Sequence, residues 1–145
     1  MTYASVNGLD LYYEIHGDGE PLIVLPGGFM TVTAMGPLVP EFAKTRRVIG
    51  VELQGHGHTA DVNRPMRFET MADDIAAVIE DARVGPAIVV GISMGGMIAQ
   101  HVALRHGHRV RGLVLLATTP GFLAGKLPDA ASLYRLLSLP FGGRR

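Results

Sequence analysis

The chain has 145 residues, of which 48% are hydrophobic and 18% are charged, and its 13 basic side chains balance its 13 acidic ones. The hydrophobic content excludes a disordered chain, the balanced charge argues against a binder of nucleic acids or anionic membranes, and the absence of cysteine excludes disulfides, thiolate metal sites and cysteine nucleophiles. The sequence begins without the pattern of a signal peptide and has no apolar run of the roughly 18 residues that a membrane span needs, so we expect a cytoplasmic protein.

The first part of the chain predicts a hairpin, a buried strand and a short helix. Asn7-Gly8 favours the left-handed dihedral angles of a tight turn, so we expect the runs 3–6 and 9–16 to pair antiparallel. The continuous apolar run 22–25 is typical of a strand buried on both faces. A weak helix is expected over 31–44, because one glycine and two prolines interrupt it.

Strands and helices then alternate along the chain. Strands are predicted at 47–53, 87–90 and 110–117, and helices at 68–81 and 97–106. A hairpin followed by this alternation is typical of the α/β class, in which a mostly parallel sheet carries helices on both faces.

The strongest functional signal is Gly91-x-Ser93-x-Gly95, which follows a predicted buried strand and opens a predicted helix. A serine hydroxyl becomes an effective nucleophile when a base removes its proton and the backbone holds the oxygen exposed. A sharp strand-to-helix turn exposes the serine and tolerates only small neighbours, which accounts for the two glycines. The amino end of the following helix favours the oxyanion that forms during acyl transfer. The alternative, a glycine-rich turn with an idle serine, is disfavoured by this strand–helix context.

Two other glycine-containing loops follow predicted strands. The loop 26–29 reads Pro-Gly-Gly-Phe, and its glycines let a backbone N–H approach a ligand oxygen, which fits a second oxyanion donor beside the amide of Met94. Taken alone, this loop is better interpreted as a plain turn. In the next loop, the spacing of His56 and His58 is compatible with metal ligands. Asp61 is the one carboxylate that follows at close spacing, and the chain has no cysteine, so the glycines of this loop favour a structural turn.

In their order and spacing, these three segments resemble the N-terminal landmarks of the α/β-hydrolase superfamily, and the stretch 51–61 is similar to a bacterial branch described as alpha/beta-fold hydrolases. The resemblance covers residues 1 to about 120. It implies the N-terminal portion of the α/β-hydrolase fold, with the first six strands of its sheet. The landmark segments are 22–29, 52–59 and 91–96.

The resemblance also assigns site residues by position. Ser93 matches the nucleophile, and the backbone amides of Gly28 and Met94 match the two oxyanion donors. Phe29 is the alternative donor and the expected substrate-binding residue. Acyl transfer to serine requires neither a metal nor an organic cofactor, so none is expected.

The sequence departs from the family pattern at three positions that support the loops. Pro26 stands where the family usually has histidine, which changes a loop-organising side chain and leaves the donor amide in place. Glu52 and Gln54 stand where aspartate and arginine are frequent. Ser93 excludes the branches with an aspartate nucleophile, such as haloalkane dehalogenases and epoxide hydrolases.

The remaining triad residues have no match in this sequence. In this fold the triad follows the chain order nucleophile, acid, histidine. The resemblance places the last two beyond a cap region, and the sequence ends where the cap would begin. We therefore expect residues 1–120 to form an incomplete core and 121–145 to be the start of the cap or a truncated tail. Of six histidines, His56 and His58 have a loop that could approach Ser93, but no acid is placed to orient either ring.

Two functions remain open from the sequence. The first is a serine hydrolase that acts on carboxylic esters or related acyl bonds of small molecules. Its histidine and acid would have to come from a missing segment or a partner chain. The second is a truncated hydrolase-like domain with little or no turnover, because it lacks the acid and histidine of the triad. In that case the outer edge of the strand 110–117 presents unpaired backbone groups on an apolar run, which predicts self-association. A phosphate-binding loop is disfavoured, because no matching glycine motif occurs.

Overall fold

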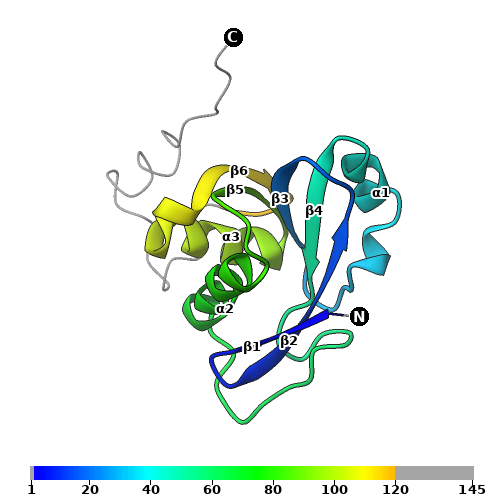
Figure 1. The fold of residues 1–145 in the computed structure, drawn as a ribbon. Helices are drawn as coiled ribbons and strands as arrows, with labels where there is room; N and C mark the ends of the chain where they lie inside the picture. The colour runs from blue at the N-terminus through cyan, green and yellow to red at the C-terminus, as the bar shows by residue number, and fades with distance from the viewer. Residues whose placement is uncertain (1, 120–145) are drawn as a thin grey trace.

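The computed structural model describes residues 2–119, which form a six-stranded sheet with helices (Figure 1). The strands in chain order are β1 Thr2–Val6, β2 Leu9–His16, β3 Glu20–Leu25, β4 Arg46–Val51, β5 Ala87–Ile92 and β6 Val110–Leu116. The helices are α1 Leu38–Ala43, α2 Phe68–Asp81 and α3 Met94–Arg105, with the 3-10 turns η1 Thr33–Met35 and η2 Gly107–Arg109.

The strands follow the order β1-β2-β4-β3-β5-β6 across the sheet. β1 and β2 pair antiparallel around Asn7 and Gly8, whose φ angles are 49° and 78°. β2 pairs antiparallel with β4, whereas β4, β3, β5 and β6 run parallel to one another. The predicted architecture, a mostly parallel sheet with an N-terminal antiparallel hairpin, is therefore confirmed.

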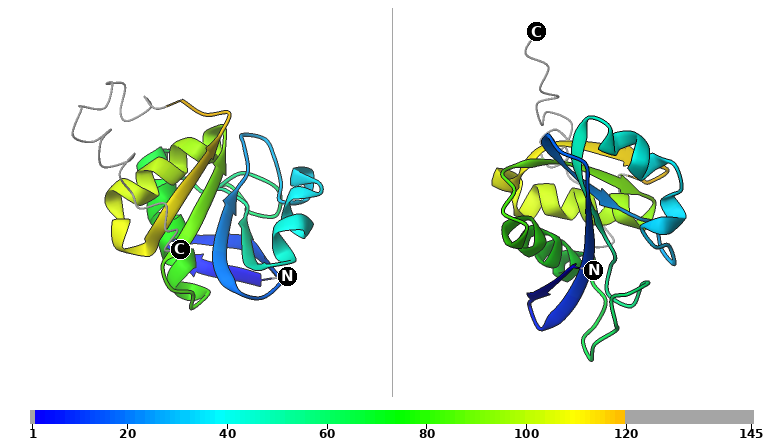
Figure 2. Two further views of the ribbon diagram at one scale, coloured as in Figure 1. Left: turned by 90° about the horizontal axis from the view of Figure 1, so that it is seen from above. Right: turned by 45° about the vertical axis from the view of Figure 1, so that its right-hand side comes forward.

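Helices cover both faces of the sheet, with α2 and α3 on one side and α1 on the other (Figure 2). Ile23 and Ile49 point into the larger core beneath α2 and α3. Their neighbours Val24 and Val48 point into the smaller core with Val39 of α1. Successive residues of β3 and β4 are thus buried on opposite faces, which explains why these strands have continuous apolar runs.

The helix bounds correct two of the predictions. The helix expected over 31–44 is divided into η1 and α1, because Gly36 ends η1 with a φ of 58° and Pro37 precedes α1. α3 begins at Met94 rather than at residue 97, directly after Ser93. The helix predicted over 68–81 is confirmed with the same bounds.

β6 lies at one edge of the sheet, beside β5. Within residues 2–119, no strand pairs with its outer side, and Val114 and Leu116 are partly exposed there. The expected self-association through this edge stays a prediction. The segment 121–145, expected to start a cap or form a tail, lies outside the described residues. None of the described helices has the length and apolar character of a membrane span.

Candidate active site

Ser93 occupies a sharp turn between β5 and α3. Its φ of 51° and ψ of −114° place a non-glycine residue in a conformation that costs about 1–3 kcal/mol. The Ser93 amide donates to the carbonyl oxygen of Leu116 at 2.9 Å, and the Ser93 carbonyl accepts the amides of Gly96 at 2.9 Å and Met97 at 3.2 Å. The end of β6 and the first turn of α3 therefore hold the strained turn, and Ser93 remains exposed.

The glycines around Ser93 are required by close backbone packing. A Cβ at Gly91 would lie 2.4 Å from the carbonyl oxygen of Gly95, and a Cβ at Gly95 would lie 2.2 Å from that of Leu25. A Cβ at Gly96 would lie 2.7 Å from the side chain of Thr118. The first turn of α3 is thus packed against the end of β3 and the segment after β6, in the arrangement that the glycine motif predicts.

The loop after β3 lies against this turn. A Cβ at Gly27 would lie 3.6 Å from the Cβ of Ser93, and a Cβ at Gly28 would lie 3.7 Å from the sulfur of Met94. The amide of Met30 donates to the carbonyl oxygen of Gly27 at 3.2 Å and closes a tight turn. The structure thus brings together the residue predicted as nucleophile and the two residues predicted to supply oxyanion donors.

Phe29 lies at the tip of this loop with a positive φ of 62°. Its side chain is fully exposed, and its ring centroid is 6.1 Å from that of His56. Its predicted roles in substrate binding and as the alternative donor stay predictions.

Two histidines of the loop after β4 support that loop. His56 Nδ1 lies 2.8 Å from the carbonyl oxygen of Gln54, and His58 Nδ1 lies 3.0 Å from Oε2 of Glu52. The ring of His58 also lies against Tyr12, with 4.4 Å between centroids. Burial and a hydrogen bond to a neighbouring glutamate raise the pKa of Tyr12 to about 12, so this phenol is neutral at physiological pH. Neither histidine hydrogen-bonds Ser93.

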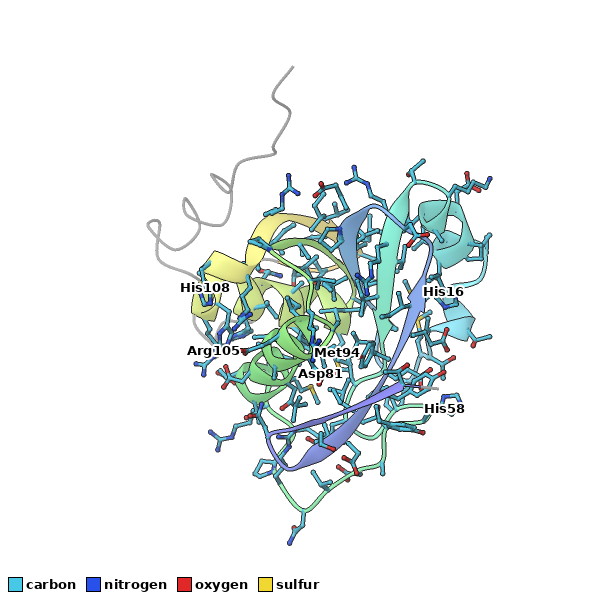
Figure 3. All side chains as sticks on the ribbon, viewed as in Figure 1. His16, His58, Asp81, Met94, Arg105 and His108 are labelled. Atoms are coloured by element: carbon cyan, nitrogen blue, oxygen red, sulfur yellow. The ribbon has the colours of Figure 1, made fainter. Side chains whose placement is uncertain are left out.

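The other histidines lie elsewhere in the fold. His16 pairs with Glu14 at 2.7 Å, and His101 is buried with its ring near Phe68. Figure 3 shows His16 and His58 on the side of the molecule near β2, and His108 beside Arg105 on the opposite side. No cluster of three or more metal-ligating side chains is found within residues 2–119.

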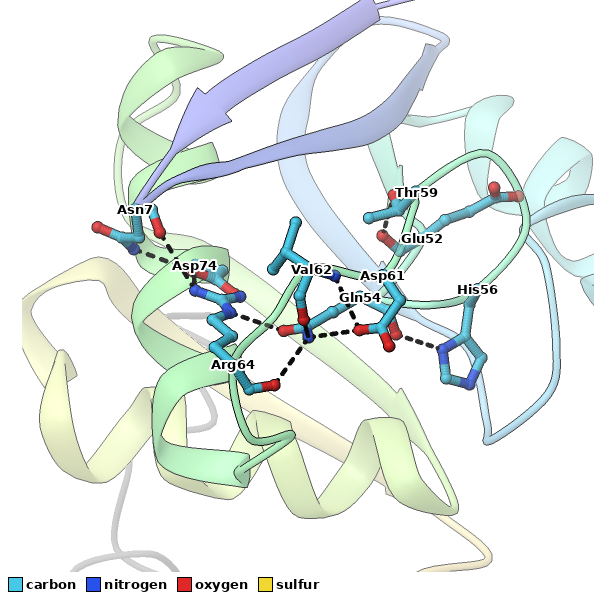
Figure 4. A network of polar contacts seen from close by, with 9 residues as sticks. All are labelled: Asn7, Glu52, Gln54, His56, Thr59, Asp61, Val62, Arg64 and Asp74. Carbon is cyan, nitrogen blue, oxygen red and sulfur yellow. Dashed lines mark hydrogen bonds and ion pairs between the residues drawn. The ribbon is translucent and has the colours of Figure 1, made fainter.

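A polar network ties the loop after β4 to the hairpin and to α2 (Figure 4). The amide group of the buried Gln54 donates to Asp61 at 2.7 Å and accepts the Nε–H of Arg64 at 2.7 Å. Arg64 also pairs with the buried Asp74, which accepts a hydrogen bond from Asn7. The sequence prediction missed Arg64 and Asp74. The one sequence signal for them was Gln54, which stands where the family frequently has arginine. In this chain the guanidinium of Arg64 reaches that position from another part of the loop.

Comparison with known proteins identifies the family. The family described as alpha/beta hydrolase fold matches residues 20–143. The chain belongs to the alpha/beta hydrolase family. A curated relative of this chain, the pimeloyl-acyl-carrier-protein methyl ester esterase of Stenotrophomonas maltophilia, is 34% identical over 116 residues, which are 80% of this chain and 42% of the relative.

Solved structures of other alpha/beta hydrolases share the fold. Est816, described as an N-acyl homoserine lactone degrading enzyme, has a TM-score of 0.79 and 30% identity over 92% of this chain and 52% of its own. The enol-lactonase from Burkholderia xenovorans has a TM-score of 0.78 and 27% identity over 82% of this chain and 47% of its own. The chain therefore spans about half the length of these relatives, whose names describe an esterase, a lactone-degrading enzyme and a lactonase.

Proposed function

We propose that the chain provides the nucleophile and the oxyanion donors of a serine hydrolase that acts on carboxylic esters or related acyl bonds of small molecules. The observation that carries the proposal is the contact between the loop after β3 and the turn at Ser93, which sets Gly28 against Met94. The names of the relatives support the bond type, because a lactone is an internal carboxylic ester.

In the proposed reaction, the Oγ of Ser93 attacks the carbonyl carbon of the ester while a base accepts its proton. Negative charge develops on the carbonyl oxygen, and the amides of Gly28 and Met94 donate hydrogen bonds to it. The positive end of α3 favours the same charge. Collapse of this intermediate breaks the bond to the alcohol oxygen, which takes up the proton held by the base, and leaves an acyl group on Ser93. Water then releases the acid and restores the serine.

One observation favours a second candidate, a catalytically incomplete hydrolase-like domain. His56 and His58, the histidines expected nearest to the serine, hydrogen-bond Gln54 and Glu52 instead. The hydroxyl of a serine without a base remains a weak nucleophile. Oxyanion donors alone can still accelerate the reaction about 10³-fold over water. Weak turnover by itself therefore does not distinguish the two candidates.

Hydrolysis of p-nitrophenyl acetate and butyrate, with and without Ser93, separates them. For a serine hydrolase we expect a burst of nitrophenol close to one equivalent per chain, because acylation by these activated esters is faster than deacylation and the acyl-enzyme accumulates. Ser93→Ala should abolish the burst. Ser5→Ala, which alters an exposed serine bonded to Asp10 on the hairpin, is the matched control and should keep the burst. Equal slow rates without a burst in all three proteins would favour the incomplete domain.

A further inference from the structure

Glu52 is a fully buried carboxylate that joins two loops at the end of β4. One oxygen, Oε1, accepts the amide of Val32 at 3.1 Å. The other, Oε2, accepts the amide of His58 at 2.6 Å and lies 3.0 Å from the Nδ1 of the same residue. The carboxylate therefore connects the loop after β3 with the loop after β4.

The surroundings of Glu52 fix the carboxylate in place. Gly57 leaves the room for it, because a Cβ at this position would lie 2.1 Å from Oε2. The hydroxyl of Thr59 donates to the Glu52 carbonyl at 2.7 Å and accepts the amide of Tyr12 at 2.9 Å. The backbone of residue 52 is thus tied to β2 as well as to its own loop.

Val32 lies at the C-terminal end of the loop that carries the proposed oxyanion donor. It follows the turn closed by Met30, which contains Gly28 and lies against the serine. The side chain of Val32 packs over Gly50 of β4, where a Cβ would lie 2.6 Å from Val32 Cγ1. Its backbone amide is bound by Glu52. The position of the loop tip therefore depends on a buried hydrogen bond to a carboxylate, which is of the stronger, charge-assisted kind.

Both carboxylate oxygens of Glu52 act as hydrogen-bond acceptors, so the side chain at this position must offer two acceptor atoms. The Val32 amide approaches one oxygen and the His58 amide approaches the other. A glutamine has nearly the same shape, but its NH2 group would face one of these donors, so one buried N–H would lose its partner. This difference makes Glu52→Gln an informative substitution.

We propose that Glu52 is a positioning residue of the hydrolase: it holds the loop 26–32 so that the Gly28 amide points to the developing oxyanion at Ser93. The inference rests on the proposed function. An oxyanion donor acts on charge that develops in the transition state, so displacement of the loop lowers kcat and leaves KM nearly unchanged. A group that only stabilises the fold would change the stability and leave both kinetic constants in place.

The first arm of the test needs no activity. Amide hydrogen exchange is followed by mass spectrometry in the wild-type chain, in Glu52→Gln and in Glu14→Gln, a control that alters a carboxylate on β2. We expect Glu52→Gln to speed exchange at least tenfold in peptides covering 26–34, with α2 and α3 unchanged. Glu14→Gln should match the wild type. Unchanged exchange over 26–34, or a uniform rise along the chain, would overturn the proposal.

The second arm measures ester hydrolysis. We expect kcat of Glu52→Gln to fall on the order of 10²-fold, as for loss of one oxyanion donor, with KM within about twofold. Glu52→Asp keeps both acceptor oxygens, and we expect it to recover part of kcat. A raised KM with unchanged kcat would overturn the positioning role.

The two arms also separate the failure of this proposal from that of the function. If the wild-type chain shows no turnover, or turnover that does not depend on Ser93, the proposed function is contradicted. The exchange measurement would still decide whether Glu52 holds the loop 26–32. Should Glu52→Gln not fold, Glu52→Asp is measured in its place. We then expect a smaller increase in the amide exchange rate, confined to peptides covering 26–34. An unchanged exchange rate there would overturn the proposal.

Discussion

Gly95 lies so close to the carbonyl oxygen of Leu25 that a Cβ on the glycine would stand 2.2 Å from it. This contact joins the first turn of α3 to the end of β3. The proposed nucleophile directly precedes the first of these elements, and the proposed oxyanion loop follows the second. Direct packing of one backbone on another therefore sets the relative position of the two halves of the candidate site.

Gly95→Ala should destabilise the protein by about 3 kcal/mol, because backbone atoms at 2.2 Å cannot yield to a methyl group without moving α3. The measurement is urea unfolding followed by circular dichroism. Gly107→Ala is the matched control, since a Cβ there meets no atom within 4 Å, and its effect should stay within about 0.5 kcal/mol. Equal shifts in the two variants would contradict this account of the turn.

Thr118→Val should stabilise the protein by about 1 kcal/mol. The Thr118 hydroxyl oxygen is buried and has no hydrogen-bond partner among residues 2–119, and the side chain packs over Gly96. Valine keeps the shape and removes the cost of burying an unpaired hydroxyl. Thermal unfolding compares this variant with Thr45→Val at an exposed position, for which no gain is expected. A lower melting temperature for Thr118→Val would show that the hydroxyl has a partner in solution.

Helices and strands with a strong hydrophobic periodicity could be predicted from the sequence. Contacts between residues that lie far apart along the chain could not. The bounds of α2 and the glycine-flanked turn at Ser93 were predicted because local periodicity and local sterics determine them. The sequence places the start of α3 three residues too late, because the glycines after Ser93 suggest a turn, whereas the amides of Gly96 and Met97 already bond the Ser93 carbonyl in the first helical turn. The contact of Glu52 with Val32 joins residues 20 apart, and no local pattern indicates it.

The same limit applies to the network around Gln54. Arg64 reaches back ten positions to Gln54 and pairs with Asp74 on α2. Sequence reasoning identified Gln54 as a departure from the family pattern but had no means of finding its partner, because side-chain reach depends on how the loop folds over α2.

The ion pair between α2 and α3 should make stability depend on acid pH. Arg105 binds Asp73 through two hydrogen bonds, and His106 lies 2.7 Å from the same carboxylate. The hydrogen bonds from Arg105, together with that from His106, hold the pKa of Asp73 below its usual value. A depressed pKa in the folded state gives stability that is present above the unfolded pKa, near 3.9, and is lost as the pH falls through the folded value.

Asp73→Asn should therefore lower the free energy of unfolding by at most about 1 kcal/mol at pH 7. The side chains of Asp73 and Arg105 are both partly exposed, so solvent screens the pair. The difference from the wild type should begin to shrink below about pH 4, where Asp73 of the unfolded chain takes up a proton, and should shrink further as the pH falls through the lowered pKa of the folded state. Urea unfolding at pH 7 and pH 3 checks this, with Asp18→Asn at an exposed loop position as the control. A loss that is the same at both pH values would contradict an electrostatic origin.

The central claim, that Ser93 is the nucleophile, is tested most directly by reaction with a fluorophosphonate probe followed by peptide mass spectrometry. We predict rapid formation of a single adduct on the peptide that contains Ser93. The adduct should be lost in Ser93→Ala and retained in Ser5→Ala. An adduct on another residue, labelling that persists in Ser93→Ala, or no labelling of the wild-type chain would contradict the claim.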